Sequence, residues 1–242
     1  MNLLAIDTAT EACSVALSID GECRERFEIA GREHSQKLPA MFASLLAEAG
    51  IAASQLDGLV AGIGPGSFAG VRIGVSFVKG LGLGLDRPAV GISSLAMLAQ
   101  AAVARGAQVV VPAIDARMNQ IYVGAYRAQQ GFAALLDAET VQDPKLWLAP
   151  ILRLDANPLA AVGSGWLAWS EVLLSRLAQT PAWVDGSALP HALDALVLAQ
   201  AEFAAGSARS ASELIPNYLR NRVALTQTEQ IAARLAARQK PV

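Results

Sequence analysis

Two aspartates, Asp7 and Asp115, are placed where a carboxylate could do chemistry. Each ends a buried run with the sequence Ala-Ile-Asp, and Asp7 is followed by the hydroxyl residues Thr8 and Thr10. A carboxylate at the end of a strand, beside small hydroxyl side chains in a tight loop, can hold a metal–phosphate group. Asp7 can instead cap its own loop through backbone amides. The loop also lacks a glycine at which a phosphate could approach the backbone, so both interpretations stay open.

A glycine-rich turn, Gly-Pro-Gly-Ser-Phe-Ala-Gly over residues 64–70, is the second candidate. It leads into an expected helix, and free N–H groups at a helix start form a natural anion site. No Lys-Ser/Thr pair closes the turn as in a P-loop, and Ser67 does not lie in a Gly-x-Ser-x-Gly elbow. The alternative is a strand-to-helix turn that needs glycine for its backbone. A vestigial phosphate or nucleotide loop would comprise Asp7, Gly64, Gly66, Ser67, Gly70 and Asp115.

The composition gives little support for a metal site or a catalytic triad. His34 and His191 are the only histidines and lie far apart, whereas a catalytic zinc usually takes three protein ligands. We therefore expect no metal. The two cysteines are expected on a hairpin in which Cys13 pairs with Ile29 and Cys23 with Ile19. That pairing places the sulfurs too far apart for a disulfide and predicts reduced thiols.

The overall balance of residues excludes several classes of protein. The chain has 242 residues, 53% hydrophobic and 17% charged, with a net charge of −2. This composition argues against intrinsic disorder and against a protein that binds nucleic acid by itself. The N-terminus has no basic region and meets Asp7 early. The apolar stretch 71–85 carries Arg72 and Lys79 and is expected to be too short for a bilayer. We therefore expect a cytoplasmic protein with no membrane association.

Hydrophobic periodicity predicts alternating strands and helices. In the first half we expect strands over 3–7, 13–19, 23–29, 56–63 and 88–92, and helices over 35–49, 71–83 and 94–103. The second half repeats this order with a strand over 109–115, a return strand around 121–125 and a glycine turn at 161–165. A long helix is expected over 192–205.

Two copies of a strand–hairpin–helix–strand–turn unit predict a duplicated α/β architecture of the actin/hexokinase/Hsp70-like (ASKHA) type. Each subdomain would have a mixed sheet and flanking helices, and the two Asp-bearing loops would face each other across a cleft. We place the N-terminal subdomain at 1–104, the C-terminal subdomain at 105–222 and a polar, helical tail at 223–242.

Glycines inside the second expected helix point to close packing. Gly74 and Gly80 lie in its interior, and Gly82 and Gly84 lie near its end. Each interior glycine costs about 1 kcal/mol relative to alanine. Close approach by another helix would compensate this cost, either in a partner or within the same domain.

Several motifs together resemble the TsaB (YeaZ) family, the partner subunit of the bacterial machinery that makes threonylcarbamoyladenosine in tRNA. The matching segments are 4–10, 13–17, 34–35, 62–74, 113–117 and 216–220. Among them, Gly-Pro-Gly-Ser-Phe-x-Gly-x-Arg-x-Gly is the most specific.

The resemblance implies an ASKHA fold that has lost its catalytic activity. The catalytic relative, TsaD, carries a His-x-x-x-His helix and a late Asp. Here Leu38 stands at the second histidine position, and residues 216–220 offer no carboxylate. The resemblance implies a pseudo-enzyme without a cofactor of its own, with ATP or ADP bound only at the assembled complex.

The resemblance also implies partners. The first two helices would pack on TsaD, the ATPase TsaE would join, tRNA would bind through the complex, and the chain alone would form homodimers. The implied interface comprises Leu38, Phe42, Leu45, Leu46, Gly74, Val75, Val78 and Leu81. The alternatives are an ATP-dependent phosphotransferase or ATPase using Asp7, Ser67 and Asp115, and a metal-dependent peptidase.

Overall fold

The first sheet of the protein has six strands and is mixed. The computed structural model describes residues 1–149 and 158–220. The strands are β1 (Leu3–Asp7), β2 (Ala12–Ile19), β3 (Glu22–Ile29), β4 (Gly58–Gly62), β5 (Pro88–Ile92) and β11 (Arg209–Ser210). Their order is β11-β5-β4-β1-β2-β3, with β1, β4 and β5 parallel and the β1–β2–β3 meander antiparallel.

The second sheet repeats this arrangement. Its strands are β6 (Val109–Arg117), β7 (Gln120–Gln129), β8 (Phe132–Gln142), β9 (Leu159–Val162) and β10 (Trp183–Asp185). The order β10-β9-β6-β7-β8 matches β5-β4-β1-β2-β3 strand for strand, with the same parallel and antiparallel pairs. The predicted duplicated ASKHA architecture is therefore confirmed.

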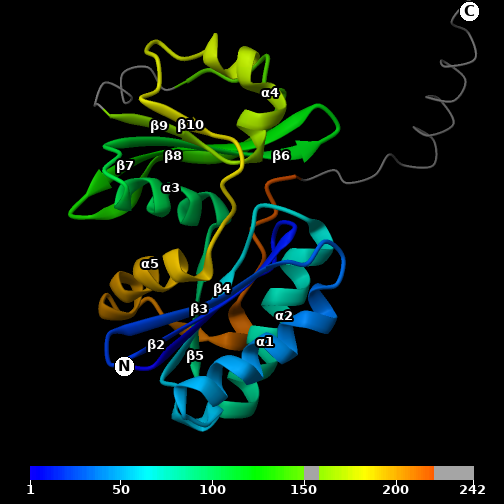
Figure 1. Cartoon of the computed structure of the whole chain (residues 1–242), viewed down its shortest axis with the longest axis vertical. Helices are drawn as coiled ribbons and strands as arrows, with labels where there is room; N and C mark the ends of the chain where they lie inside the picture. Colours follow the sequence, from blue (N-terminus) through cyan, green and yellow to red (C-terminus); the bar gives the residue numbers. More distant parts are fainter. Residues whose placement is uncertain (150–157, 221–242) are drawn as a thin grey trace, which may run out of the picture.

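Within the described residues, five α-helices cover the two sheets (Figure 1). They are α1 (His34–Ala49), α2 (Phe68–Leu85), α3 (Ser94–Ala104), α4 (Ser164–Leu174) and α5 (Ala192–Ala204). The α1–α2 pair covers one face of the first sheet, and α4 covers the outer face of the second. Between the two sheets lie α3 and α5, which contact each other.

The two middle helices are exchanged relative to the predicted division of the chain. Although α3 precedes residue 105, its apolar side chains pack on the second sheet. Conversely, α5 packs on the first sheet, and β11 adds a strand to it. A boundary at 104/105 therefore does not separate the two packed layers. The tail predicted at 223–242 lies outside the described residues.

The first hairpin has the predicted turn but a different register. Asp20 and Gly21 both adopt positive φ and close a two-residue turn, as hairpin twist requires. Cys13 faces Glu28, and Cys23 faces Ser18. The predicted pairing is wrong by one residue because the two-residue turn pairs Ile19 with Glu22. Both cysteines are free thiols, and burial raises the pKa of the Cys13 thiol to about 11.

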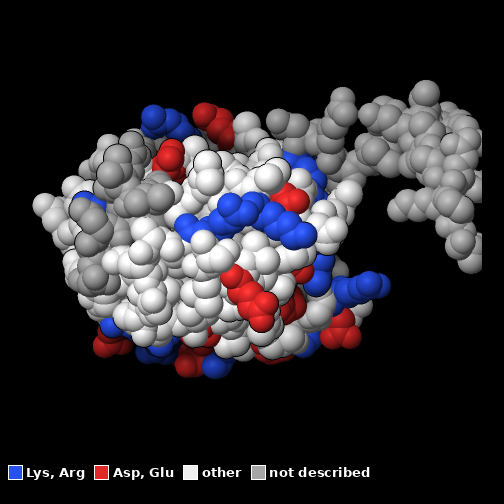
Figure 2. Space-filling view, turned by 90° about the horizontal axis from the view of Figure 1, so that it is seen from above, with Lys and Arg blue, Asp and Glu red and all other residues white. Residues whose placement is uncertain are grey.

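Helix α2 is longer than the periodicity predicts because Ser67 caps it three residues earlier, accepting a hydrogen bond from the Gly70 amide. Among the described residues, α2 alone is long and apolar enough to cross a membrane, a test that core helices of soluble proteins also pass. The low charge of the sequence is visible on the face above the second sheet. There a band of basic side chains crosses a largely uncharged surface (Figure 2).

Candidate functional site

The carboxylate of Asp7 is sealed inside the protein. It accepts hydrogen bonds from the Ala9 amide at 3.1 Å and from the Ser94 hydroxyl at 3.3 Å, and the residue is fully buried. Burial raises the pKa of Asp7 to about 6, although both hydrogen bonds oppose the shift. The loop that follows Asp7 lines the cleft opposite Asp115, as predicted. The Asp7 carboxylate itself points inward and caps its own loop, which is the alternative that the sequence left open.

The glycines of the motif serve the packing of the same loop. Glycines occur at every fourth position, 62, 66, 70 and 74, and each lies against the segment Asp7–Ala9. A Cβ atom at Gly66 or Gly70 would overlap a backbone carbonyl oxygen of that segment. Hydrogen bonds from the Ser67 amide to the Ala9 oxygen at 2.7 Å and from the Thr8 hydroxyl to the Gly70 oxygen at 2.7 Å close the contact. The glycines therefore allow the segment 62–74 to pack closely on the loop that follows β1.

A cleft of about 740 Å³ separates the two halves near this loop. Three of the six predicted loop residues, Gly66, Ser67 and Asp115, line it, and the other three do not. Asp115 pairs with Arg117 at 2.9 Å, and its amide donates to the Ser164 hydroxyl. Of the two expected aspartates, only Asp115 lines the cleft, and the other carboxylate of the lining is Glu11.

An aromatic–arginine cluster stands at the mouth of the cleft, and the motif analysis missed it. The guanidinium of Arg72 lies 3.6 Å from the centre of the Phe68 ring, and its Nε donates a 2.9 Å hydrogen bond to the Tyr218 hydroxyl. Phe68 and Tyr218 remain 48% and 46% exposed. Residues 68 and 218 are far apart in the sequence, so only their membership of two quoted motifs hinted at the cluster.

A second carboxylate, the half-buried Glu139, joins three segments. The hydroxyls of Ser93 and Tyr126 donate to it, and the Asn217 amide donates at 2.8 Å. Burial raises the pKa of Glu139 despite these hydrogen bonds. It lines a further cavity of about 720 Å³ between β8 and α5. The network ties the C-terminal segment to both sheets, and nothing in the local sequence pattern indicated it.

The two histidines lie in separate structural contacts. His34 is buried, with Nε2 3.2 Å from the Ala12 oxygen. His191 stacks on Phe27 and pairs with Glu25 at 2.9 Å, a hydrogen bond that raises the pKa of His191. Within residues 1–149 and 158–220, no group of three acidic, cysteine or histidine side chains is placed to hold a metal ion.

The predicted partner residues face inward. Leu38, Leu45, Leu46, Gly74, Val75 and Val78 are buried in the core between α1, α2 and the first sheet, and Phe42 and Leu81 are half-buried there. The prediction that they form an exposed interface is wrong for the six buried residues. An amphipathic helix uses its apolar face for its own core first.

A different surface of the same helices is open. We call it the outer helix face and define it by its exposed residues, Ala40, Ala43, Ala47, Ser76, Gly80, Leu83 and Gly84. A Cβ atom at Gly80 or Gly84 would meet nothing within 4 Å, and Leu83 is 66% exposed. These two glycines therefore have no packing reason within the described chain.

Comparison with known proteins gives the family. Residues 28–148 match the family model described as "TsaD: tRNA N6-adenosine threonylcarbamoyltransferase". The chain is 40% identical over 232 residues to the tRNA threonylcarbamoyladenosine biosynthesis protein TsaB of Escherichia coli K12, covering 93% of this chain and 96% of that protein. The TsaB of Haemophilus influenzae is also 40% identical, with 92% and 95% covered.

Solved structures agree with these relatives. A Pseudomonas aeruginosa protein described as similar to the peptidase YEAZ superposes with a TM-score of 0.84 and 43% identity, covering 90% of this chain and 99% of that one. A structure described as YeaZ from Pseudomonas aeruginosa superposes with a TM-score of 0.83 at the same identity and coverage. Fold, motifs and near full-length identity agree, and the chain belongs to the TsaB (YeaZ) family of tRNA threonylcarbamoyladenosine biosynthesis proteins.

Proposed function

We propose that this chain is a non-catalytic subunit of the tRNA threonylcarbamoyladenosine modification complex, which dimerises with and activates the catalytic subunit TsaD. The observation that carries the proposal is the 40% identity, over nearly the whole chain, to a protein named for the biosynthesis of this nucleoside. The sealed Asp7 supports a non-catalytic role, because a carboxylate closed inside its own loop cannot bind a metal–phosphate group.

The outer helix face supports pairing with a related subunit. Half of the chain matches the TsaD family model, and subunits with related folds can pair through equivalent helices about a twofold axis. Small side chains on both helices would let a second helix pair approach closely, and Gly80 and Gly84 leave room for it. A second copy of the chain would occupy the same face when TsaD is absent, which accounts for the proposed homodimer.

The wider assembly follows from the same proposal. TsaE would join the TsaD heterodimer, tRNA would bind through the complex, and ATP or ADP would bind only at the assembled complex. The chain would act in the cytoplasm without membrane association. Its own cleft would need no cofactor.

Capture of TsaD from the same organism by the tagged full-length chain tests the proposal. Ala43→Arg and Gly80→Arg place a bulky charge on the outer helix face without touching the core, and we expect them to abolish capture. Gln200→Arg, on the exposed side of α5, is the matched control and should retain it.

Two outcomes would contradict separate parts of the proposal. Full capture by both outer-face variants would show that the interface lies elsewhere. If the wild-type chain fails to capture TsaD and deletion of its gene leaves tRNA threonylcarbamoyladenosine unchanged, the proposed function itself is wrong.

A further inference from the structure

We propose that the mouth of the cleft binds a single-stranded segment of RNA, with an unstacked base on the aromatic–arginine cluster and phosphates on the surrounding arginines. The inference rests on the proposed function in one respect, namely that the RNA is the tRNA substrate. The site is formed by Phe68, Arg72, Tyr218, Arg117 and Arg220.

The aromatic rings at the mouth are available for stacking. The centres of the Phe68 and Tyr218 rings lie 6.2 Å apart, and the rings are tilted by 39°. Arg72 holds both, stacking on Phe68 and donating to the Tyr218 hydroxyl. Aromatic rings that are exposed side by side on a surface often mark a binding site. Single-stranded RNA is typically recognised by stacking its bases on such rings and on arginine planes.

Positive charge around the mouth is not neutralised by the protein. Arg32 and Arg220 line the cleft and Arg72 stands at its edge, and none of the three forms an ion pair within the described residues. The Nη2 atom of Arg220 donates hydrogen bonds to the Ala116 oxygen at 2.9 Å and to Gln120 Oε1 at 2.8 Å, whereas its buried Nε has no hydrogen-bond partner there. Glu11 and Asp115 are the acidic residues of the lining, and Asp115 is paired with Arg117. Four arginines against two carboxylates favour an anionic ligand although the whole chain has a net charge of −2.

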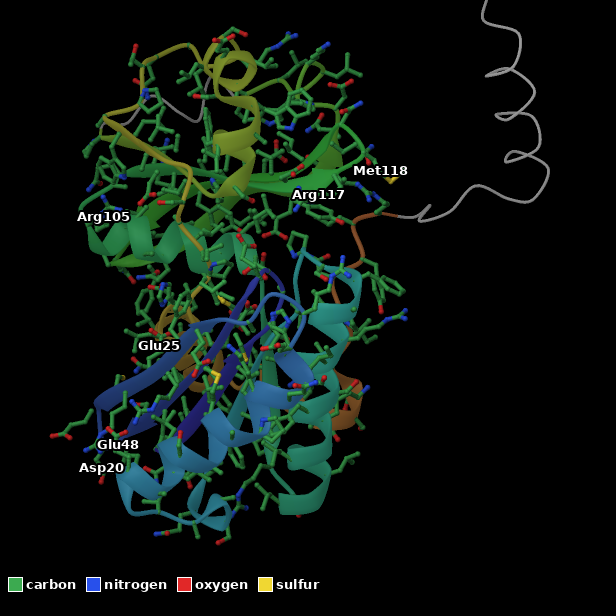
Figure 3. All side chains as sticks on the ribbon, turned by 45° about the vertical axis from the view of Figure 1, so that its right-hand side comes forward. Asp20, Glu25, Glu48, Arg105, Arg117 and Met118 are labelled. Atoms are coloured by element: carbon green, nitrogen blue, oxygen red, sulfur yellow. The ribbon has the colours of Figure 1, made fainter. Side chains whose placement is uncertain are left out.

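The opposite lip of the cleft projects a further cation and an apolar side chain. Arg117, Met118 and Asn119, at the turn between β6 and β7, all adopt left-handed backbone conformations. Such strain in consecutive residues with side chains is concentrated at functional sites. The Arg117 side chain is 86% exposed and Met118 is 71% exposed. Figure 3 shows both at the edge of the second half, beside the C-terminal segment, with Arg105 on the opposite side of the molecule.

A strand of RNA fits these features better than a free nucleotide does. The Asp7 carboxylate is buried and accepts hydrogen bonds from the Ala9 amide and the Ser94 hydroxyl, so it does not reach into the cleft to hold the metal–phosphate group of a nucleotide. The aromatic rings and cations instead line the outer mouth on both lips, which suits a chain that passes across the cleft.

Fluorescence anisotropy with a labelled, unmodified tRNA transcript tests this site in the full-length chain. We expect Phe68→Ala to weaken binding about tenfold, as loss of one stacking platform does. Arg117→Ala should lower the slope of log affinity against log salt by about 0.7. Tyr218→Phe keeps the ring and should bind nearly as wild type, whereas Tyr218→Ala should not. Arg105→Ala removes one exposed arginine far from the cleft and should leave affinity unchanged.

No binding by the wild-type chain at low salt, or equal losses for Arg105→Ala and Arg117→Ala, would overturn the inference. Capture of TsaD by the same variants separates it from the proposed function. Loss of RNA affinity with normal TsaD capture supports the site. Loss of TsaD capture with normal RNA affinity assigns the cluster to a protein partner and overturns it. If the wild-type chain captures no TsaD, that result counts against the proposed function alone. Weaker RNA binding by these variants would still support the site.

Discussion

The hydroxyl of Ser94 donates a 3.3 Å hydrogen bond to the buried carboxylate of Asp7, joining the start of α3 to the end of β1. The Ser94 amide also donates to the Gly64 oxygen at 2.8 Å. Asp7, at the end of a strand of the first sheet, therefore contacts the start of the helix that packs on the second sheet.

Asp7→Asn should flatten the dependence of stability on pH. Burial raises the pKa of Asp7 to about 6, above its usual value near 4. Between these values the folded state binds more protons than the unfolded state, so stability falls as pH rises and is constant above about 6. The loss is on the order of 3 kcal/mol.

Urea unfolding of both proteins between pH 4 and 8 measures this effect. The difference between them isolates Asp7 from Glu139 and Asp194, whose pKa values are also raised by burial. Parallel pH profiles would show that Asp7 does not titrate as a buried acid.

Two glycines on the same helix should respond oppositely to alanine. At Gly70 a Cβ atom would overlap the Thr8 oxygen, so Gly70→Ala should destabilise by about 1–3 kcal/mol through overpacking. At Gly80 the Cβ atom would meet open space, and Gly80→Ala should stabilise the isolated chain by about 1 kcal/mol. Thermal unfolding by circular dichroism measures both, and a gain in stability at position 70 would refute the packing argument.

A glutamate introduced on the inner face of α1 should affect stability differently from a glutamate introduced on its outer face. Leu45 is buried in the core and Ala43 is exposed on the same helix. Leu45→Glu should lower stability by several kcal/mol or prevent folding, because an unpaired charge is buried. Ala43→Glu should change stability by about 0.5 kcal/mol or less. Soluble expression and denaturant midpoints report the contrast, and a well-folded Leu45→Glu protein would contradict it.

Removing one donor to Glu139 should loosen the link to the C-terminal segment. Tyr126→Phe deletes a hydrogen bond to this half-buried carboxylate and should cost about 1–3 kcal/mol. Tyr122→Phe is the matched control on the same strand, because its hydroxyl makes no hydrogen bond in the described part of the chain. Hydrogen exchange at residues 214–219 should accelerate in the first variant and not in the second. Equal exchange in the two would show that the network does not hold this segment.

Much of the fold could be predicted because strands and helices leave local periodic signals. The repeated Ala-Ile-Asp strand ends predicted the duplication, which the matching strand orders of the two sheets confirm. The hairpin register depended on the turn rather than on apolar matching, so the alternation of Cys13 and Ile29 misled by one residue. The exchange of α3 and α5 has no local signal, because an Ala-rich apolar helix fits either sheet.

The candidate site was harder to predict because its features depend on the direction in which side chains point. Asp7 lies at the expected strand end, but its side chain turns inward. The spacing of Leu38, Leu45 and Leu46 correctly marked one helical face, and that face covers the protein's own sheet. The free face is marked instead by small residues such as Ala43 and Gly80, which carry no hydrophobic signal.

The exchange of α3 and α5 has a consequence for synthesis on the ribosome. Helix α5 covers side chains of the first sheet, among them Leu3, Ala5 and Val60. These side chains therefore remain exposed to solvent until residues 192–204 have left the exit tunnel. A nascent chain paused before that point should therefore be sensitive to protease and dependent on chaperones. The gene for this protein should therefore not divide into two independently folding halves, even though the two sheets share one strand order.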